Sequence, residues 1–273
     1  MDMVANTSSA LLQLSNVYLR QGSEKLDPPR LAPINLRVFS GERVAVLGPS
    51  GAGKSTLLHL MSLEQRSSQG EVTFKDRTRC AWSIAALSEH RAVMPQQCQA
   101  AFGLEVALVI GLGRVARTCD PFLSEIVYEA AKLAHADHLL HRRLDTLSGG
   151  ECARVHLARV FAQLWDSREG MVLVDEPLAT LDPGLQENIL ESLDTYVSHR
   201  RHAIISVLHD MNHAMYCFDR LLLIKEGNLY ADVSSNRDAM PLLEDLYGLQ
   251  LECVQTTSQA LFVSSRAKRR RVA

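Results

Sequence analysis

The sequence lacks the features that mark several classes of protein. Its six cysteines are scattered and none forms a C-x-x-C pair, which favours reduced thiols over a disulfide framework or a zinc site. The richest apolar run, residues 104–112, carries a glutamate and is shorter than the roughly 18 residues that span a bilayer. Residues 1–10 show no basic start followed by an apolar core, so we expect no signal peptide. If the protein serves a membrane process, another chain must do the crossing.

The chain also has little net charge. The 273 residues carry a net charge of −2, which gives no general argument for nucleic-acid binding, and we expect no nucleic-acid partner. Residues 266–273 form a basic tail that we interpret as a solvated end. Apolar residues make up 47% of the chain, enough for a substantial core, and the length allows one large domain or two small ones; we expect one domain over residues 1–265.

One glycine-rich stretch fits the phosphate-binding pattern G-x-x-x-x-G-K-[ST]. An apolar run that reads as a strand precedes it, and a run that reads as a helix follows it. In that context the backbone N–H groups bind phosphate oxygens, Lys54 reaches the β- and γ-phosphates of a nucleoside triphosphate, and the Ser55 hydroxyl binds Mg²⁺. The residues of this P-loop are Gly48, Pro49, Ser50, Gly51, Ala52, Gly53, Lys54, Ser55 and Thr56.

Two carboxylates follow the apolar strand expected at residues 171–174. Open α/β sheets bind their ligands at the carboxyl ends of the strands, which is where Asp175 and Glu176 would lie. Asp175 fits the role of a Mg²⁺ ligand, directly or through water. Glu176 fits the general base that polarises an attacking water. Together with the P-loop, this pair predicts hydrolysis of the nucleotide.

The remaining pattern alternates strands with helices. We expect strands at residues 11–19 and 34–38, joined by a polar link at 21–33, and helices at 121–133, 136–140, 151–164 and 185–196. This predicts an α/β fold of the P-loop NTPase class with a mostly parallel sheet. We also expect an antiparallel N-terminal β part and an inserted helical subdomain at about residues 97–148.

A second glycine-bearing loop opens the helix expected at residues 151–164. Free N–H groups and a hydroxyl at a helix N-terminus can bind an anion, although a serine cap with flexible glycines would account for the loop by itself. The loop consists of Leu147, Ser148, Gly149, Gly150 and Glu151.

These motifs together resemble the ATP-binding cassette (ABC) ATPases over about residues 11–250. The 147–151 loop matches the signature loop of that family, which binds the γ-phosphate of ATP held by a second cassette. The elements occur in the family's order: the P-loop, Gln96, the signature loop, Asp175 and Glu176, Asp182, and His209.

The resemblance implies further roles. Gln96 would contact Mg²⁺ and the attacking water, and link the site to a transmembrane partner. Asp182 would join the two sites across a homodimer, and His209 would contact the γ-phosphate and orient Glu176. The implied partners are two transmembrane permease subunits and a periplasmic substrate-binding protein. The cassettes would lie at the cytoplasmic face of the bacterial inner membrane.

Residues 91–96 and 111–114 are similar to the import ATPases for iron complexes and cobalamin, and within that group to the haemin-import subunits. The alternatives are the ATPase of an exporter, which uses the same chemistry with another partner, and a soluble cassette ATPase without a transport role. The chain departs from the family in some places. Many cassettes stack adenine on an aromatic residue ahead of the P-loop, where Tyr18 is the nearest candidate although Gln21 aligns better. His135, His138 and His141 are spaced along an expected helix, and we interpret them as a solvated face and not as a haem site.

Overall fold

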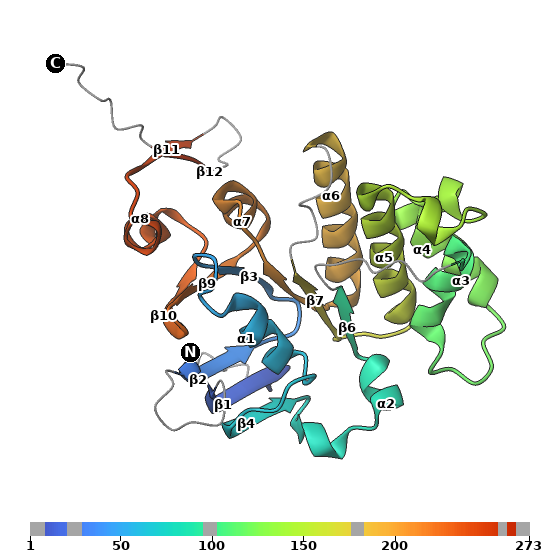
Figure 1. Ribbon diagram of the computed structural model, residues 1–273, viewed down its shortest axis with the longest axis horizontal. Helices are drawn as coiled ribbons and strands as arrows, with labels where there is room; N and C mark the ends of the chain where they lie inside the picture. The colour runs from blue at the N-terminus through green and yellow to red at the C-terminus, as the bar shows by residue number, and fades with distance from the viewer. Residues whose placement is uncertain (1–8, 21–28, 95–102, 176–182, 256–260, 266–273) are drawn as a thin grey trace, which may run out of the picture.

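The computed structural model describes residues 9–20, 29–94, 103–175, 183–255 and 261–265. The elements of this part are drawn in Figure 1. The strands are β1 (Leu12–Arg20), β2 (Pro29–Val38), β3 (Arg43–Leu47), β4 (Gln69–Phe74), β5 (Arg77–Thr78), β6 (Arg91–Met94), β7 (Met171–Asp175), β8 (Ala203–Val207), β9 (Arg220–Lys225), β10 (Asn228–Ser234), β11 (Leu251–Gln255) and β12 (Leu261–Ser265). The helices are α1 (Lys54–Met61), α2 (Ile84–Ser88), α3 (Val106–Gly111), α4 (Leu123–Leu133), α5 (Gly149–Gln163), α6 (Pro183–Arg200), α7 (Met211–Cys217) and α8 (Met240–Tyr247).

The large sheet has the strand order β10-β9-β3-β8-β7-β6. Its pairings are parallel except for the β9–β10 hairpin. A second sheet, ordered β2-β1-β4-β5, is antiparallel throughout. The expected α/β fold, with a mostly parallel core and an antiparallel N-terminal part, is therefore confirmed.

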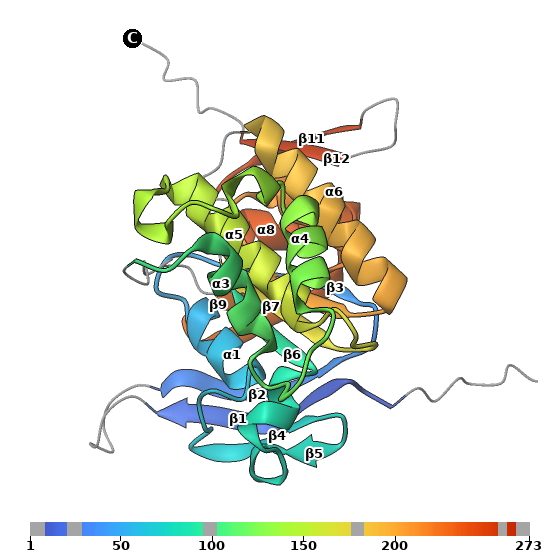
Figure 2. The same ribbon diagram turned by 90° about the vertical axis from the view of Figure 1, so that its right-hand side faces the viewer.

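The central strands are apolar on both faces because both faces of the large sheet are covered. In β3, Val44 and Val46 belong to an apolar cluster shared with the N-terminal sheet, whereas Ala45 and Leu47 belong to a cluster shared with the helices. Helix α1 is buried with the first cluster and contacts β2, β7 and β8. Figures 1 and 2 both show α1 between the large sheet and the β1–β2–β4 layer.

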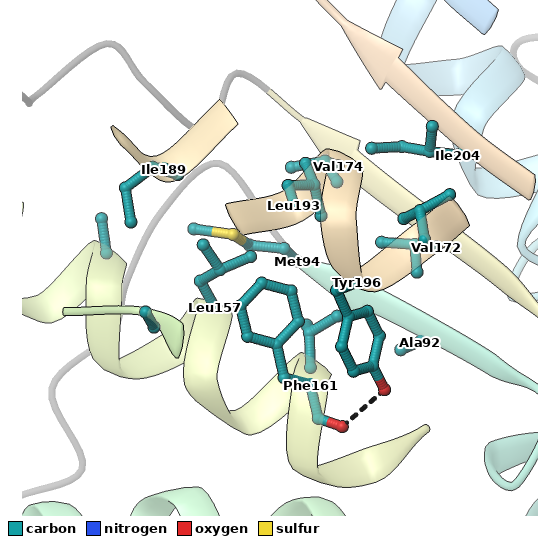
Figure 3. Close-up of a cluster of buried hydrophobic side chains, with 14 of the residues drawn as sticks. Ala92, Met94, Leu157, Phe161, Val172, Val174, Ile189, Leu193, Tyr196 and Ile204 are labelled. Carbon is teal, nitrogen blue, oxygen red and sulfur yellow. Dashed lines mark hydrogen bonds between the residues drawn. The ribbon is translucent and has the colours of Figure 1, made fainter. Parts of the chain in front are cut away.

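Helices α5 and α6 cover the other face of the large sheet. Figure 3 shows their side chains meeting those of β6, β7 and β8, with Phe161 of α5 beside Tyr196 of α6. The two ring centroids are 4.5 Å apart, and the Tyr196 hydroxyl donates to the Phe161 carbonyl oxygen at 2.7 Å. That bond satisfies the one polar group of a side chain that is otherwise fully buried.

The segment between β6 and β7 is mainly helical and packs α3 and α4 onto α5. Arg114 ties it to the end of α5: the buried guanidinium pairs with Asp120, donates to Asp166 at 2.9 Å and donates to the Ala162 carbonyl at 3.0 Å. The treatment of residues 97–148 as a separate subdomain stays a prediction.

Some expected boundaries were wrong. The helix expected at 121–133 starts at Leu123, and the one expected at 136–140 is only a 3₁₀ turn at Asp137–Leu139, because α4 ends where His135 takes a left-handed φ of 52°. Strand β2 begins at Pro29, inside the link expected at 21–33. It lies at a sheet edge, where prolines are tolerated.

Helix α8 and the β11–β12 hairpin were not predicted from the sequence. None of the helices in the described ranges is long and apolar enough to cross a membrane.

Candidate functional site

The P-loop lies between a strand and a helix, as predicted. Strand β3 ends at Leu47, and α1 begins at Lys54 after Gly53, which takes a left-handed φ of 104°. A Cβ on Gly53 would lie 3.0 Å from the Leu31 side chain. A Cβ on Gly48 would lie only 2.2 Å from the Ile224 carbonyl oxygen. Both positions therefore require glycine, the first for its backbone angle and the second for a close approach of β9.

Lys54 lies inside the loop that it terminates. Its side chain is 6% exposed, and Nζ donates to the carbonyl oxygens of Gly48 at 2.9 Å and Pro49 at 3.1 Å. The ammonium group is thus held at the start of the loop, and Lys54 is itself the first residue of α1. A cation next to unpaired helix N–H groups is the arrangement that binds the phosphates of a nucleotide.

Four neighbouring strands of the large sheet deliver the other motifs to one edge. Val46 of β3 pairs with Val207 of β8, which in turn pairs with Asp175 at the end of β7. The backbones of Val46 and Asp175 are therefore about 10 Å apart, two strand spacings. In the sequence, Gln96 and Glu176 come shortly after β6 and β7, but both lie outside the described residues, as does Asp182.

Asp175 and Ser55 have the chemistry of a magnesium site. Asp175 is 7% exposed at the carboxyl end of β7, and Ser55 is half-buried in the first turn of α1, the helix that packs on β7. A carboxylate and a hydroxyl are hard oxygen donors, which Mg²⁺ prefers together with phosphate and water. The residues present therefore fit the metal that the sequence predicted.

His209 follows β8 and is exposed. The next residue, Asp210, caps α7: its side chain accepts from the Asn212 N–H at 2.7 Å. The cap fixes the point at which the chain leaves the sheet, and so the place of His209 at the edge. Helix α7 therefore begins directly after its capping residue.

The signature loop is an N-cap with a reciprocal pair of bonds. The Ser148 hydroxyl accepts from the Glu151 N–H at 3.3 Å, and the Glu151 carboxylate accepts from the Ser148 N–H at 2.8 Å. The bond from Ser148 is the largest cause that lowers the pKa of Glu151, and Arg142 adds to it. Ser148 and Gly149 remain exposed, so the N-terminus of α5 is open to an anion from outside.

Tyr18 is the candidate for adenine stacking that the structure describes. Tyr18 is half-buried in β1, where its carbonyl oxygen accepts from the Ser68 N–H at 2.8 Å. Gln21 lies outside the described residues. The role of Tyr18 stays a prediction.

Two contacts with the P-loop were missed from the sequence. Arg30 of β2 donates through Nε to the Thr56 hydroxyl at 2.8 Å, and the Tyr247 hydroxyl of α8 accepts from the Gly48 N–H at 3.1 Å. The partners are 26 and 199 residues apart, and no local pattern signals either pairing.

His135, His138 and His141 are exposed, but they do not share a helix face as expected, because only His138 lies in a helical turn, the 3₁₀ turn at Asp137–Leu139. Within the described ranges, no group of three or more His, Cys, Asp or Glu side chains could hold a metal ion.

Comparison with known proteins gives the family. The model of the ABC transporter family matches residues 31–179, more than half of the chain. The chain belongs to this family. It is an ATPase of the cassette type, as the order of its motifs indicated.

Several curated relatives of the cassette are named haemin import ATP-binding protein HmuV. The protein of Pseudomonas putida is 38% identical over 88% of this chain and 94% of its own length. The protein of Pseudomonas aeruginosa is 38% identical over 80% of this chain and 84% of its own. The protein of Gloeobacter violaceus is 40% identical over 73% of this chain and 74% of its own length.

Solved structures share the cassette's fold. A dimeric ATP-binding cassette bound to ADP and phosphate has a TM-score of 0.74 at 23% identity, covering 82% of this chain and 99% of that one. A proposed metal-chelate type ABC transporter in an inward-facing conformation has a TM-score of 0.76 at 21% identity. The match covers 95% of this chain and 99% of that one.

Proposed function

We propose that the chain is the ATP-hydrolysing subunit of an ABC importer for haemin or a related iron complex. The observation that supports this choice of cargo is the 38% identity with a haemin import ATP-binding protein along 94% of that protein's length. ATP hydrolysis itself follows from membership of the family and from the P-loop and Asp175, which lie at the carboxyl ends of β3 and β7 in the large sheet.

Binding of ATP rests on the P-loop. The N–H groups of the loop and of α1 bind the phosphates, and Lys54, whose Nζ already lies at the loop, neutralises the β- and γ-phosphates. Ser55 and Asp175 would hold Mg²⁺, with Gln96 as a further ligand. The metal would neutralise charge on the β- and γ-phosphate oxygens.

Hydrolysis needs a base beside the γ-phosphate. In the sequence, Glu176 directly follows Asp175, the last residue of β7. Its carboxylate accepts a proton from the attacking water, and His209, at the end of the neighbouring β8, orients Glu176 and contacts the γ-phosphate. Gln96 would orient the same water.

The site is completed by a second copy of the chain. Ser148, Gly149 and Gly150 of one copy would bind the γ-phosphate held by the P-loop of the other, and Asp182 would link the two sites. The exposed N-terminus of α5, already ordered by the capping pair, supports this arrangement because it offers N–H groups to an external phosphate without further reorganisation.

Partners in the membrane would be two permease subunits, with a periplasmic binding protein supplying the cargo. The helical segment has an exposed apolar groove of about 680 Å³ that suits such a contact. The exposed apolar side chains of this segment are Leu108, Leu112, Val115, Phe122, Leu123 and Tyr128. In this assembly the cassette lies at the cytoplasmic face of the inner membrane.

Capture of the membrane partner tests this function. The tagged chain, expressed in its own host, should retain a many-helix permease, and the purified complex should show ATPase activity that haemin-loaded binding protein stimulates. Stimulation by a ferric siderophore or cobalamin system instead would move the cargo to those classes. Recovery of a soluble partner with no permease would refute the transport role.

A further inference from the structure

The first residue of the P-loop is held by the C-terminal part of the chain. The Gly48 N–H donates to the hydroxyl of Tyr247, the last residue of α8, at 3.1 Å. This is a contact with the loop itself, at the residue where β3 gives way to the phosphate-binding turn.

The position of Tyr247 is fixed by its own helix. Leu243 and Leu246 of α8 are buried in the apolar cluster on the helical face of the large sheet, and the Tyr247 ring packs on the same cluster. Asp245 forms an ion pair with Lys225 at the end of β9, with Nζ and Oδ2 3.0 Å apart. Beyond the helix, Gly248 takes a left-handed φ of 64° and ends α8. The hydroxyl is therefore presented to Gly48 from an anchored helix.

The β9–β10 hairpin holds the same loop from a second side. The Ile224 carbonyl oxygen lies 2.2 Å from the position that a Cβ on Gly48 would take, and the Gly227 N–H donates to the Ala52 carbonyl at 2.9 Å. Loop, hairpin and α8 thus form one unit. Within it, Tyr247 is the residue of α8 whose side chain bonds the backbone N–H of Gly48.

A line of hydrogen bonds runs from α8 to the phosphate-binding lysine. The N–H of Gly48 bonds the Tyr247 hydroxyl, and the carbonyl of Gly48 accepts from Lys54 Nζ at 2.9 Å. Rotation of Gly48 would therefore move the acceptor that holds the ammonium group. We propose that Tyr247 is a positioning residue for ATP binding, acting through Gly48 on Lys54.

The chemistry of the hydroxyl suits this role. Burial raises the pKa of Tyr247, so the group stays a neutral acceptor across the physiological range. The inference rests on ATP binding at the P-loop alone, whichever cargo the transporter carries.

Two roles for Tyr247 can be separated by kinetics. A hydroxyl that only fastens α8 would affect unfolding and leave the KM for ATP unchanged. A hydroxyl that positions Lys54 affects nucleotide binding in the folded protein. Tyr196→Phe is the matched control, because it also removes a tyrosine hydroxyl bonded to the backbone, in this case one that donates to the Phe161 carbonyl between α5 and α6.

The experiment measures steady-state ATPase activity of the full chain with ATP and with GTP, mant-ATP binding, and the melting temperature. For Tyr247→Phe we expect KM and the mant-ATP Kd to rise about five- to tenfold, the factor that one lost hydrogen bond corresponds to. The rise should be equal for ATP and GTP, because the phosphates and not the base are affected. We expect kcat to change less than twofold and Tyr196→Phe to keep the wild-type KM.

An unchanged KM in Tyr247→Phe would overturn the proposal, whether or not the melting temperature falls. A second variant, Tyr247→Leu, removes the ring as well. A rise in KM in Tyr247→Leu but not in Tyr247→Phe would assign the effect to ring packing and also overturn it. A wild-type chain without ATPase activity would instead refute the proposed function, so the two failures are distinguishable.

Discussion

Gly48→Ala should damage nucleotide binding through one contact that the structure defines. The added Cβ would lie 2.2 Å from the Ile224 carbonyl oxygen and 3.4 Å from the Ala52 Cβ. Ordinary contacts between non-bonded heavy atoms are about 3.5 Å, so the loop or the end of β9 must move by about 1 Å. The obstacle is backbone, which no side-chain rotation can relieve.

The size of the effect follows from that displacement. Overpacking of this kind costs about 1–3 kcal/mol of the free energy of unfolding. A misplacement of about 1 Å at a reacting group can cost about 10²-fold in rate. We therefore expect kcat/KM for ATP to fall by about 10- to 100-fold, mainly through KM, because Gly48 also holds Lys54.

Gly41→Ala is the matched control. Gly41 has a φ of +82° in the turn before β3, and nothing lies within 4 Å of its would-be Cβ. The left-handed backbone angle costs an alanine about 1–2 kcal/mol of stability without a clash at the P-loop. Urea unfolding and steady-state ATPase assays should thus show similar losses of stability in the two variants but a normal kcat/KM in Gly41→Ala. A Gly48→Ala protein with wild-type kcat/KM would refute the reasoning.

Three further outcomes are expected. Glu176→Gln should cut turnover by about 10²-fold or more while mant-ATP still binds, and near-normal turnover would remove Glu176 from the role of base. Ser148→Arg should abolish hydrolysis by blocking the contact across the dimer, and normal hydrolysis by a monomeric preparation of that variant would contradict the shared site. Burial lowers the pKa of His202 to about 4 from an ordinary 6.5, so the unfolded chain takes up the proton first as the pH falls. The stabilisation from this group is full above about pH 6.5 and is lost as the pH falls towards 4. The free energy of unfolding measured in urea should therefore be about 2 kcal/mol lower at pH 5 than at pH 7. In a His202→Gln variant, the amide oxygen can replace Nδ1 as the acceptor for the Gly170 N–H, and this part of the pH dependence should be absent. If the free energy of unfolding of that variant fell with pH as steeply as that of the wild type, other groups would cause the effect.

The sequence predicted the parts of the site whose function depends on local backbone form. The P-loop, the capped start of α5 and the strand ending at Asp175 each combine a local pattern with a nearby chemical group, so residue order alone was sufficient. The strand order could not be read this way. It is the order β3-β8-β7-β6 that brings segments more than 100 residues apart to one edge of the sheet.

Contacts between distant segments could not be predicted from the sequence for the same reason. Tyr247 contacts Gly48 only because α8 packs beside β9, and α8 itself was not predicted. The early start of β2 was missed because prolines normally argue against a strand, an argument that fails at a sheet edge.

ATP-driven uptake of haemin tests the central claim most directly. The chain and its permease would be reconstituted in liposomes with haemin-loaded binding protein on one side and Mg-ATP on the cassette side. We expect haemin uptake that requires ATP and is lost with Glu176→Gln. ATP-dependent uptake of a ferric siderophore or cobalamin, with none of haemin, would contradict the assigned cargo, and haemin uptake unaffected by Glu176→Gln would contradict hydrolysis at this site as its driving force.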